Sequence, residues 1–258
     1  MTTPSLGFIG GGRVTRIFLE GWTRAGRLPA NVIVSDPNPE LLAKLKFRFP
    51  SITTTADNAT AAAQDFVFVA VHPPMLADTV TALKAALKPE AVVVSLAPKF
   101  TFAKLTGLLG GFTRLARIIP NAPSIIGAGY NPVAFSPALS TGDKTALLEL
   151  LAPLGESPEV ADEKLEGYAV LSAMGPTYFW FQLQTLREVA SGFGLSDGEI
   201  VPAMKRMVCG ATRTLLESGL TPAEVMDLVP VKPLADMEAQ VTEMYRTRLP
   251  AIHQKIKP

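Results

Sequence analysis

The sequence contains one cysteine, Cys209, in 258 residues. A single cysteine cannot form an internal disulfide, which excludes the small secreted scaffolds that depend on disulfides. Cys209 lies in KRMVCGATRTLL, a pattern typical of the apolar face of a helix. We therefore expect a buried, unreactive thiol in a protein of a reducing compartment.

Histidine is nearly as rare, with His72 and His253 as its two occurrences. Neither lies in a run of cysteine, aspartate or glutamate with metal-ligand spacing, so the sequence predicts no metal site. No Ser-His-Asp pattern and no pair of catalytic carboxylates is apparent either. Whatever chemistry the chain performs is expected to come from another kind of site.

Charged side chains are also sparse, at 18% of the chain, and their signs balance, with 24 Lys and Arg against 23 Asp and Glu. This balance offers no basic surface typical of binding to nucleic acid or to acidic membranes. No uninterrupted apolar run reaches about 18 residues, and the N-terminus lacks a signal-like pattern. We expect a cytoplasmic protein that binds neither nucleic acid nor a membrane.

Hydrophobic residues, in contrast, make up 48% of the chain, enough for a sizeable core in one large domain or two ordinary ones. Runs typical of strands buried on both faces are LGFIG, VIVSD, FVFVAV, AVVVSLA and RLARIIP. Segments of helical periodicity alternate with them: TRIFLEGWTRAG, PELLAKLKFRF, PMLADTVTALKAAL and FTFAKLTGLLG. The alternation predicts a Rossmann-like α/β domain over residues 1–162. NPVAF and SPEVA, on either side of a helix in STGDKTALLELLAPLG, are candidates for short added strands.

The strand patterns stop after residue 162, and residues 163–258 predict an all-helical domain whose segment ends carry Pro, Gly, Ser or Thr. The aromatic run YFWF, from Tyr178 to Phe181, covers more than one face of its helix. We expect it to be buried in the core or in a dimer interface, with a ligand-stacking role as the alternative. The apolar residues of this region, YFWF among them, predict a homodimer or larger homo-oligomer built through it.

Three glycines, Gly10 to Gly12, follow the first predicted strand and precede a helical segment that begins near Arg13. This is the context that a dinucleotide-binding fingerprint requires. Gly10 allows the tight turn, Gly12 leaves room for a pyrophosphate, and the phosphates would sit at the positive end of the helix. Thr15 stands where the pattern has a third glycine or an alanine, which weakens the match.

Asp36 ends the second predicted strand, where a carboxylate accepts hydrogen bonds from the adenosine ribose hydroxyls. That placement favours NADH, because a 2′-phosphate would meet a negative charge. Two alternatives stay open. DPNPE is also a good helix start with Asp36 as its cap, and Arg13 could partly accommodate a 2′-phosphate.

Beyond the fingerprint, the chain resembles the pyrroline-5-carboxylate reductase family from Leu6 to about Leu228. The stretches that carry the resemblance are GFIGGGRV, Asp57-Asn58, FVFVAVHPP, RIIPNAPSIIGAG, LSAMGPTYFWF and CGATRTLLESG. The most specific of them is an arginine, two hydrophobic residues and P-N-x-P, followed by G-x-G. The resemblance implies an enzyme that reduces a cyclic imine to proline with NAD(P)H, as a dimer or larger assembly formed through the helical domain.

The resemblance also implies which residues form the site. Gly10, Gly12, Arg13 and Val14 would hold the pyrophosphate; Asn58 would lie near the adenosine ribose; Val71, His72 and Pro73 would pass beside the cofactor; and Ala97 and Asn121 would lie near the nicotinamide. Ser172 would lie at the substrate, and Gly175, Pro176 and Thr177 would begin a helix whose amides face the substrate carboxylate.

Several positions depart from the family pattern in the substrate half. Where the family has Ser-Gly-Ser-Gly-Pro-Ala, this chain has SAMGPT, which replaces the second hydroxyl with Met174. A Ser-Pro-Gly-Gly-Thr-Thr segment is replaced by VPVKPL, in which Lys232 is either an anion anchor for the substrate or a solvated surface lysine. His72 replaces a lysine, and Ala97-Pro98-Lys99 replaces Ala-Ala-Gly.

Two functions therefore stay open at the level of sequence. One is a reductase of a cyclic imine or a related small imino or keto acid, favoured by Asn121, Ser172 and Gly175-Pro176. The other is a cofactor-binding dimer with reduced turnover that acts as a sensor or binds a partner, favoured by the loss of both hydroxyl-bearing motifs.

Overall fold

The computed structural model describes residues 4–71 and 73–258. The chain forms two compact units, the first up to Met174 with Ile252–Pro258, and the second from Gly175 to Ala251. The sequence pattern, in contrast, predicts a domain boundary at residue 162. Residues 163–174 lie in the first unit, where Leu165 and Ala169 pack with Ile119.

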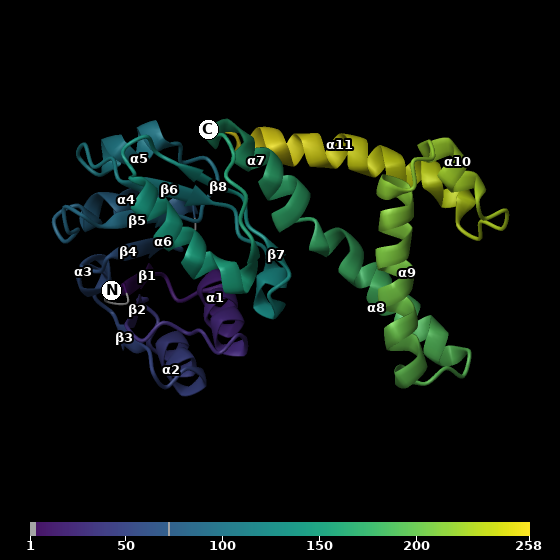
Figure 1. Cartoon of the computed structure of the whole chain (residues 1–258), viewed down its shortest axis with the longest axis horizontal. Helices are drawn as coiled ribbons and strands as arrows, with labels where there is room; N and C mark the ends of the chain where they lie inside the picture. The colour runs from purple at the N-terminus through teal and green to yellow at the C-terminus, as the bar shows by residue number, and fades with distance from the viewer. Residues whose placement is uncertain (1–3, 72) are drawn as a thin grey trace. The chain divides into compact units, whose positions relative to one another are not determined.

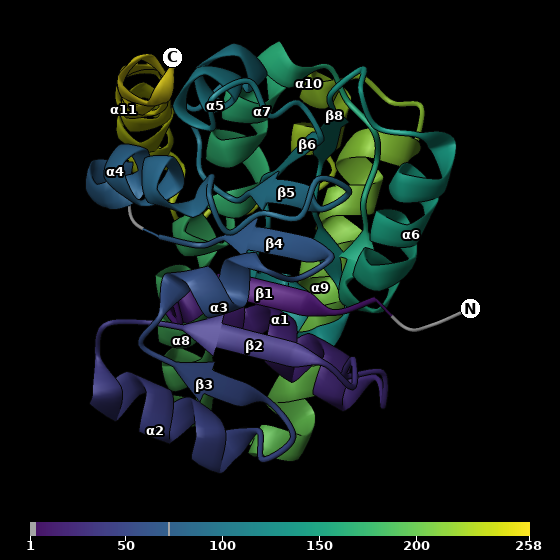
Figure 2. The same ribbon diagram turned by 90° about the vertical axis from the view of Figure 1, so that its left-hand side faces the viewer.

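A seven-stranded sheet forms the centre of the first unit (Figure 2). Its strands are β1 (Leu6–Ile9), β2 (Val32–Ser35), β3 (Thr53–Thr55), β4 (Phe66–Val69), β5 (Val92–Ser95), β6 (Leu115–Ile118) and β8 (Val133–Phe135). They lie in the order β3-β2-β1-β4-β5-β6-β8, and every neighbouring pair is parallel except β6 and β8. The order reverses between β1 and β4, which confirms the predicted Rossmann-like topology.

Helices cover both faces of this sheet because its central strands carry apolar side chains on both sides. On one face α1 (Arg13–Arg24), α2 (Pro39–Arg48) and α6 (Thr141–Leu151) pack on a core that includes Phe8, Phe68 and Trp22. The rings of Phe8 and Phe68 are stacked with their centroids 4.7 Å apart. On the other face lie α3 (Asn58–Ala62), α4 (Pro73–Leu83) and α5 (Phe102–Leu108).

Three local features differ from the sequence expectations. Strand β3 and helix α3 were not predicted, because TTT is a short polar run and NATAA is only five residues long. NPVAF contains β8, as predicted, whereas SPEVA is not a strand and contributes one bridge, from Glu159 to Val133. Pro158 has no backbone N–H with which to extend that bridge into a ladder. A separate two-stranded sheet pairs β7 (Gly129–Tyr130) with β9 (Gly155–Glu156).

The second unit is helical, as the sequence predicts (Figure 1). The helices of the C-terminal region are α7 (Leu165–Tyr168), α8 (Pro176–Gly192), α9 (Asp197–Glu217), α10 (Pro222–Asp227) and α11 (Glu238–Ile256). Capping boxes start two of them, with Ser196 and Glu199 at α9 and Thr221 and Glu224 at α10. Among residues 4–71 and 73–258, no helix is both long and apolar enough to span a bilayer.

The burial predicted for Cys209 is wrong within a single chain, and YFWF is not buried in the core of its own unit. Cys209 is exposed, and so are Phe179, Trp180 and Phe181, with exposed fractions of 53%, 52% and 67%. Helices α8 and α9 carry apolar side chains on more faces than their contacts with each other and with α10 cover. Exposure in one chain does not test the prediction that YFWF is buried in a dimer interface.

Candidate functional site

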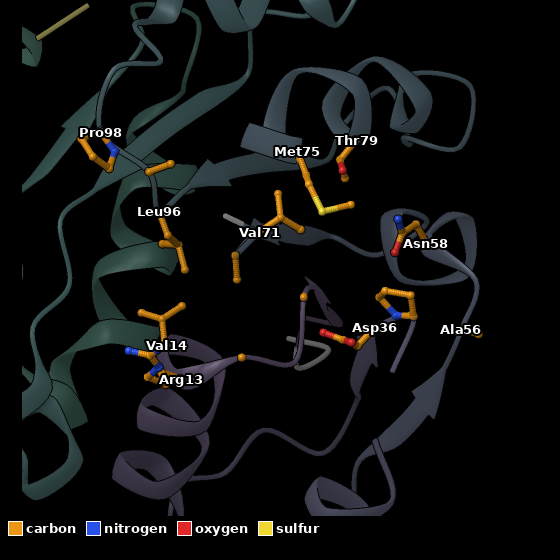
Figure 3. A pocket seen from close by; sticks show the side chains of 15 residues that line it. Arg13, Val14, Asp36, Ala56, Asn58, Val71, Met75, Thr79, Leu96 and Pro98 are labelled. Atoms are coloured by element: carbon orange, nitrogen blue, oxygen red, sulfur yellow. The ribbon is translucent and has the colours of Figure 1, made fainter. Parts of the chain in front are cut away.

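A pocket of about 560 Å³ lies at the carboxyl ends of the parallel strands (Figure 3). The residues that line it are Gly10, Gly12, Arg13, Val14, Asp36, Pro37, Ala56, Asn58, Ala70, Val71, Met75, Thr79, Leu96, Ala97 and Pro98. Most of them directly follow β1, β2, β3, β4 or β5, and these ends meet because the strands are parallel. Ligands of open α/β sheets bind at this edge, beside the point where the strand order reverses.

The glycine turn between β1 and α1 forms one wall of the pocket. Gly10 has φ +105°, and a Cβ there would lie 2.8 Å from the carbonyl oxygen of Ala70. A Cβ on Gly12, in contrast, would meet nothing within 4 Å and would point into open space. Gly10 is therefore required by the fold, whereas Gly12 keeps space free beside the pocket.

Thr15, at the third position of the fingerprint, is accommodated by burial and by a hydrogen bond to the glycine turn. Its side chain is fully buried, and its hydroxyl donates a hydrogen bond of 2.6 Å to the carbonyl oxygen of Gly10. In the described part of the chain no side chain caps the start of α1, and its first turn has no acidic residue. The free N–H groups and the helix dipole at this end suit an anionic group.

Asp36 lies at the opposite side of the pocket from Leu96 and Pro98 (Figure 3). Its Oδ2 accepts a hydrogen bond from the amide of Gly11 at 2.9 Å, and its Oδ1 accepts one from the amide of Asn38 at 2.8 Å. The side chain of Asn38, and not that of Asp36, caps α2 by accepting from Glu40 and Leu41. The interpretation of Asp36 as the helix cap is therefore wrong.

Asn58 lines the same side of the pocket, at the start of α3. Its Oδ1 accepts a hydrogen bond of 2.7 Å from the hydroxyl of Ser35, which fixes the amide against the end of β2. The cap of α3 is Asp57. Hydrogen bonds from the Thr60 hydroxyl and the Ala59 amide hold the pKa of Asp57 below its ordinary value.

The remaining wall comes from segments after β4 and β5 and from α4. Val71 and Ala97, both predicted, line the pocket, whereas His72 lies outside the described residues. Pro73 is the first residue of α4. The lining residues that the sequence patterns did not indicate are Pro37, Ala56, Ala70, Met75, Thr79, Leu96 and Pro98. Five of them lie one to three residues beyond the end of a strand, whereas Met75 and Thr79 are one helical turn apart on α4. The ends of the predicted strands were therefore the sequence feature that could have indicated most of these residues.

Asn121 is not among the described residues that line this pocket, and lies instead in a buried polar cluster of the same unit. Its Nδ2 donates to the carbonyl oxygen of Ser172 at 3.3 Å, and its Oδ1 accepts from the amide of Tyr130 at 3.1 Å. The Ser172 hydroxyl donates to the carbonyl oxygen of Tyr168 at 2.9 Å. Burial and the neighbouring Tyr168 hydroxyl raise the pKa of Tyr130. Asn121 thus joins two segments far apart in the sequence.

Ser172 sits in a π-helical turn, Ala169–Ala173, which is followed by α8. Such turns often occur at functional sites. Gly175 precedes α8, Pro176 is its first residue, and Thr177 follows in the first turn. Lys232 is exposed on the segment between α10 and the short helix Ala235–Met237, where its carbonyl oxygen accepts from the amide of Ala235.

The residues of the pocket fit a dinucleotide. An uncapped helix start, a glycine with free space beside it and a half-buried carboxylate are grouped around one pocket of about 560 Å³. The described residues contain no group of three or more His, Cys, Asp or Glu side chains able to hold a metal ion.

Comparisons with known proteins agree with this geometry. The family model described as NADP oxidoreductase, coenzyme F420-dependent, matches residues 5–99. Pyrroline-5-carboxylate reductase of Pseudomonas aeruginosa is 30% identical over 227 residues, which cover 87% of this chain and 83% of that protein.

Solved structures share the fold. A pyrroline-5-carboxylate reductase from Coxiella burnetii is 25% identical with a TM-score of 0.70, over 99% of this chain and 95% of that one. Pyrroline carboxylate reductase of Plasmodium falciparum, solved with NADP bound, has a TM-score of 0.83 at 18% identity, over 100% of this chain and 98% of that one.

Proposed function

Because the chain belongs to the pyrroline-5-carboxylate reductase family, we propose that it is an NAD(P)H-dependent oxidoreductase that reduces the C=N bond of a cyclic imine. The substrate is 1-pyrroline-5-carboxylate, which gives proline, or a related small imino or keto acid. The observation that carries the proposal is the pocket that brings Gly10, Gly12, Asp36, Asn58 and Ala97 to one edge of the parallel sheet. A cofactor-binding sensor without turnover is not favoured, because the relatives are named as reductases.

The proposal assigns a role to each residue of the cofactor half. The N–H groups at the start of α1, with Gly12, Arg13 and Val14, bind the pyrophosphate, and Gly10 shapes the turn beneath it. Asn58 borders the adenosine ribose, and Val71 and Ala97 lie along the rest of the cofactor, whereas the family resemblance alone assigns His72 and Pro73 to this stretch. A reduced nicotinamide, when bound, supplies the hydride chemistry.

The preference between cofactors rests on Asp36. Its carboxylate faces the pocket and holds the turn through Gly11, where it can accept hydrogen bonds from ribose hydroxyls. A 2′-phosphate at the same place would be repelled, so the proposal includes a preference for NADH over NADPH. Arg13, exposed on the pocket wall, limits that preference.

The substrate half is assigned to Ser172 and to Gly175, Pro176 and Thr177 at the start of α8. The amides of that first turn bind the substrate carboxylate, and Pro176 removes an N–H that would need a partner. Asn121 is assigned to the neighbourhood of the nicotinamide, and its Nδ2 holds the Ser172 backbone and so orients the segment that carries Ser172. An iminium is already electrophilic, so orientation of this kind can supply much of the rate.

The proposal also covers the assembly and the cell. By role, the proposal assigns dinucleotide binding to residues 1–162 and both substrate binding and dimerisation to residues 163–258, whose exposed apolar side chains would pair two subunits, although residues 163–174 pack in the first compact unit. A homodimer or larger homo-oligomer follows from this. The single thiol suits a reducing compartment, and we place the protein in the cytoplasm on that ground.

The test is steady-state oxidation of NADH and NADPH with 1-pyrroline-5-carboxylate and a panel of related imino and keto acids. We expect turnover with at least one cyclic imine that carries a carboxylate, and the amine product identified by mass spectrometry. Cofactor binding without oxidation across the whole panel would contradict the proposed reductase activity and would favour the cofactor-binding sensor.

A further inference from the structure

A buried arginine joins two carboxylates at a distance from the pocket. Arg117 on β6 is 1% exposed, and its Nη2 donates to Oε1 of Glu166 at 2.6 Å. Its Nη1 donates to Oδ1 of Asp162 at 2.5 Å. Glu166 is itself 2% exposed, so the Arg117–Glu166 pair is almost completely removed from water. Buried ion pairs of this kind are costly to form and are weak evidence for a purely stabilising role.

Both carboxylates also hold the segment that follows β5, one at Lys99 in the loop and the other at Phe102, the first residue of α5. Oε1 of Glu166 accepts a hydrogen bond from the amide of Lys99 at 3.0 Å, and Oδ2 of Asp162 accepts a long one from the amide of Phe102 at 3.5 Å. The same loop carries Ala97 and Pro98, which line the pocket. The cluster therefore connects the pocket wall to the segment that leads to Ser172.

Lys99 has an unusual backbone conformation. Its φ is +74°, and it is the one residue other than glycine with a positive φ in the described chain. A side chain with a Cβ adopts this left-handed region only at an energetic cost, which the surrounding structure must offset. The bond from the Lys99 amide to a charged, buried acceptor is the contact that can do so, because such bonds are stronger than neutral ones.

We propose that Glu166, oriented by Arg117, is a positioning residue of the cofactor site. It holds Lys99 in the left-handed conformation and so fixes Ala97 and Pro98 at the pocket wall. The proposal rests on the proposed function for the identity of the ligand, a nicotinamide dinucleotide, and adds residues that touch neither the ligand nor the pocket. Asp162 has the lesser part, since its bond to the loop is longer and its side chain is 22% exposed.

The experiment combines two readouts on the full-length protein: hydrogen exchange of the loop amides without cofactor, and the Kd for NADH and NADPH by fluorescence titration. The main variant is Glu166→Gln, which keeps the size of the side chain and removes its charge. The matched control is Asp143→Asn. Asp143 pairs with Arg114 at 2.8 Å in the same unit, and neither residue lines the pocket in the described structure.

We expect Glu166→Gln to accelerate exchange in residues 97–102 and to raise the cofactor Kd about tenfold, the change that corresponds to losing one such anchor. Asp143→Asn should lower Tm without either effect. Because glycine adopts a positive φ freely, adding Lys99→Gly to Glu166→Gln should restore the Kd to within about twofold of the parent. A drop in Tm alone, with Kd and loop exchange as in the control, would overturn the proposal.

A second series covers the case in which Glu166→Gln does not fold. With the ion pairs intact, Lys99→Gly should leave the Kd unchanged, and Lys99→Val should raise it by about tenfold, because a β-branched residue is an outlier at this φ. Equal Kd values for the two variants would refute the role of the left-handed conformation. If the parent binds neither cofactor, the proposed function fails, while the exchange of residues 97–102 still decides whether Glu166 anchors the loop.

Discussion

The hydroxyl of Thr15 donates a hydrogen bond of 2.6 Å to the carbonyl oxygen of Gly10, within the turn that joins β1 to α1. Both residues are buried. The bond gives a hydrogen-bond donor to a carbonyl that is buried away from water. It also joins the first turn of the helix to the glycine segment. A threonine at the third position of the fingerprint therefore stabilises the glycine turn through its hydroxyl.

We predict that Thr15→Val destabilises the protein by about 1–3 kcal/mol, because the Gly10 carbonyl loses its partner while the side-chain volume is kept. The cofactor Kd should rise as well, since the turn is less firmly held. Denaturant unfolding and fluorescence titration measure the two effects. Thr15→Ser, which keeps the hydroxyl, is the control. Identical unfolding curves for Thr15→Val and the parent would show that the bond contributes nothing.

Gly12 and Gly10 should respond differently to substitution. Gly12→Val is expected to abolish cofactor binding and to leave Tm near that of the parent, because a Cβ at Gly12 meets no protein atom within 4 Å. Gly10→Ala is expected to lower both, since Gly10 has φ +105° and a Cβ there would lie 2.8 Å from the Ala70 carbonyl oxygen. Undiminished NADH binding by Gly12→Val would mean that the turn is structural only.

The contrast between these glycines shows what the sequence could and could not reveal. A strand, a glycine turn and a helix are adjacent in the chain, so the pattern predicts them, whereas Asn58, Val71 and Ala97 came from the family resemblance and seven of the fifteen lining residues were not indicated. Strand β3 was missed because Thr53–Thr55 is a polar run that gains its place by pairing with β2 at the edge of the sheet. The anchor of Lys99 was invisible for a related reason, since Glu166 is 67 residues away in the sequence.

The predicted burial of side chains in the helical unit failed for a different reason. The apolar pattern around Cys209 and Trp180 was recognised correctly, yet a pattern does not tell what covers a helix face. Both residues line a groove of about 660 Å³ on α8 and α9. Whether such a face is buried depends on what packs against it, and one sequence taken alone does not contain that information.

Asp36→Ala should weaken NADH binding by about tenfold and favour NADPH relative to it, because the ribose hydroxyls lose a charged acceptor and a 2′-phosphate loses a repulsive neighbour. The ratio of the two Kd values is the measurement. Asp36→Asn separates charge from shape, as it removes the charge while it keeps a side chain able to accept from Gly11. A ratio unchanged in both variants would leave Asp36 as a support of the turn only.

We predict an oligomer at micromolar concentration, measured by light scattering. Trp180→Glu should shift it toward the monomer, since Trp180 is 52% exposed on the apolar face of α8. Phe47→Glu is the control, because Phe47 is 89% exposed on α2 of the other unit and should not matter. Cys209 should react with a thiol reagent faster in Trp180→Glu than in the parent. A monomeric parent would contradict the assembly.

The last prediction concerns Lys232, which replaces a hydroxyl-bearing segment of the family with a single cation. Pro230 and Pro233 flank it closely and restrict the backbone, so the ammonium group is less free than on an open loop. If it binds the substrate carboxylate in the ground state and the transition state alike, Lys232→Met should raise KM about tenfold with little change in kcat.

The affinity for NADH should be unaffected by that change, because Lys232 is not among the described residues of the cofactor pocket. Lys205, a lysine of the same helical unit on α9, provides the matched control as Lys205→Met. A KM effect in Lys232→Met that is absent in Lys205→Met separates an anion anchor from general loss of positive charge. Since an isolated, solvated lysine contributes little, unchanged kinetics in Lys232→Met would remove Lys232 from the site and leave the substrate carboxylate to Ser172 and the amides at the start of α8.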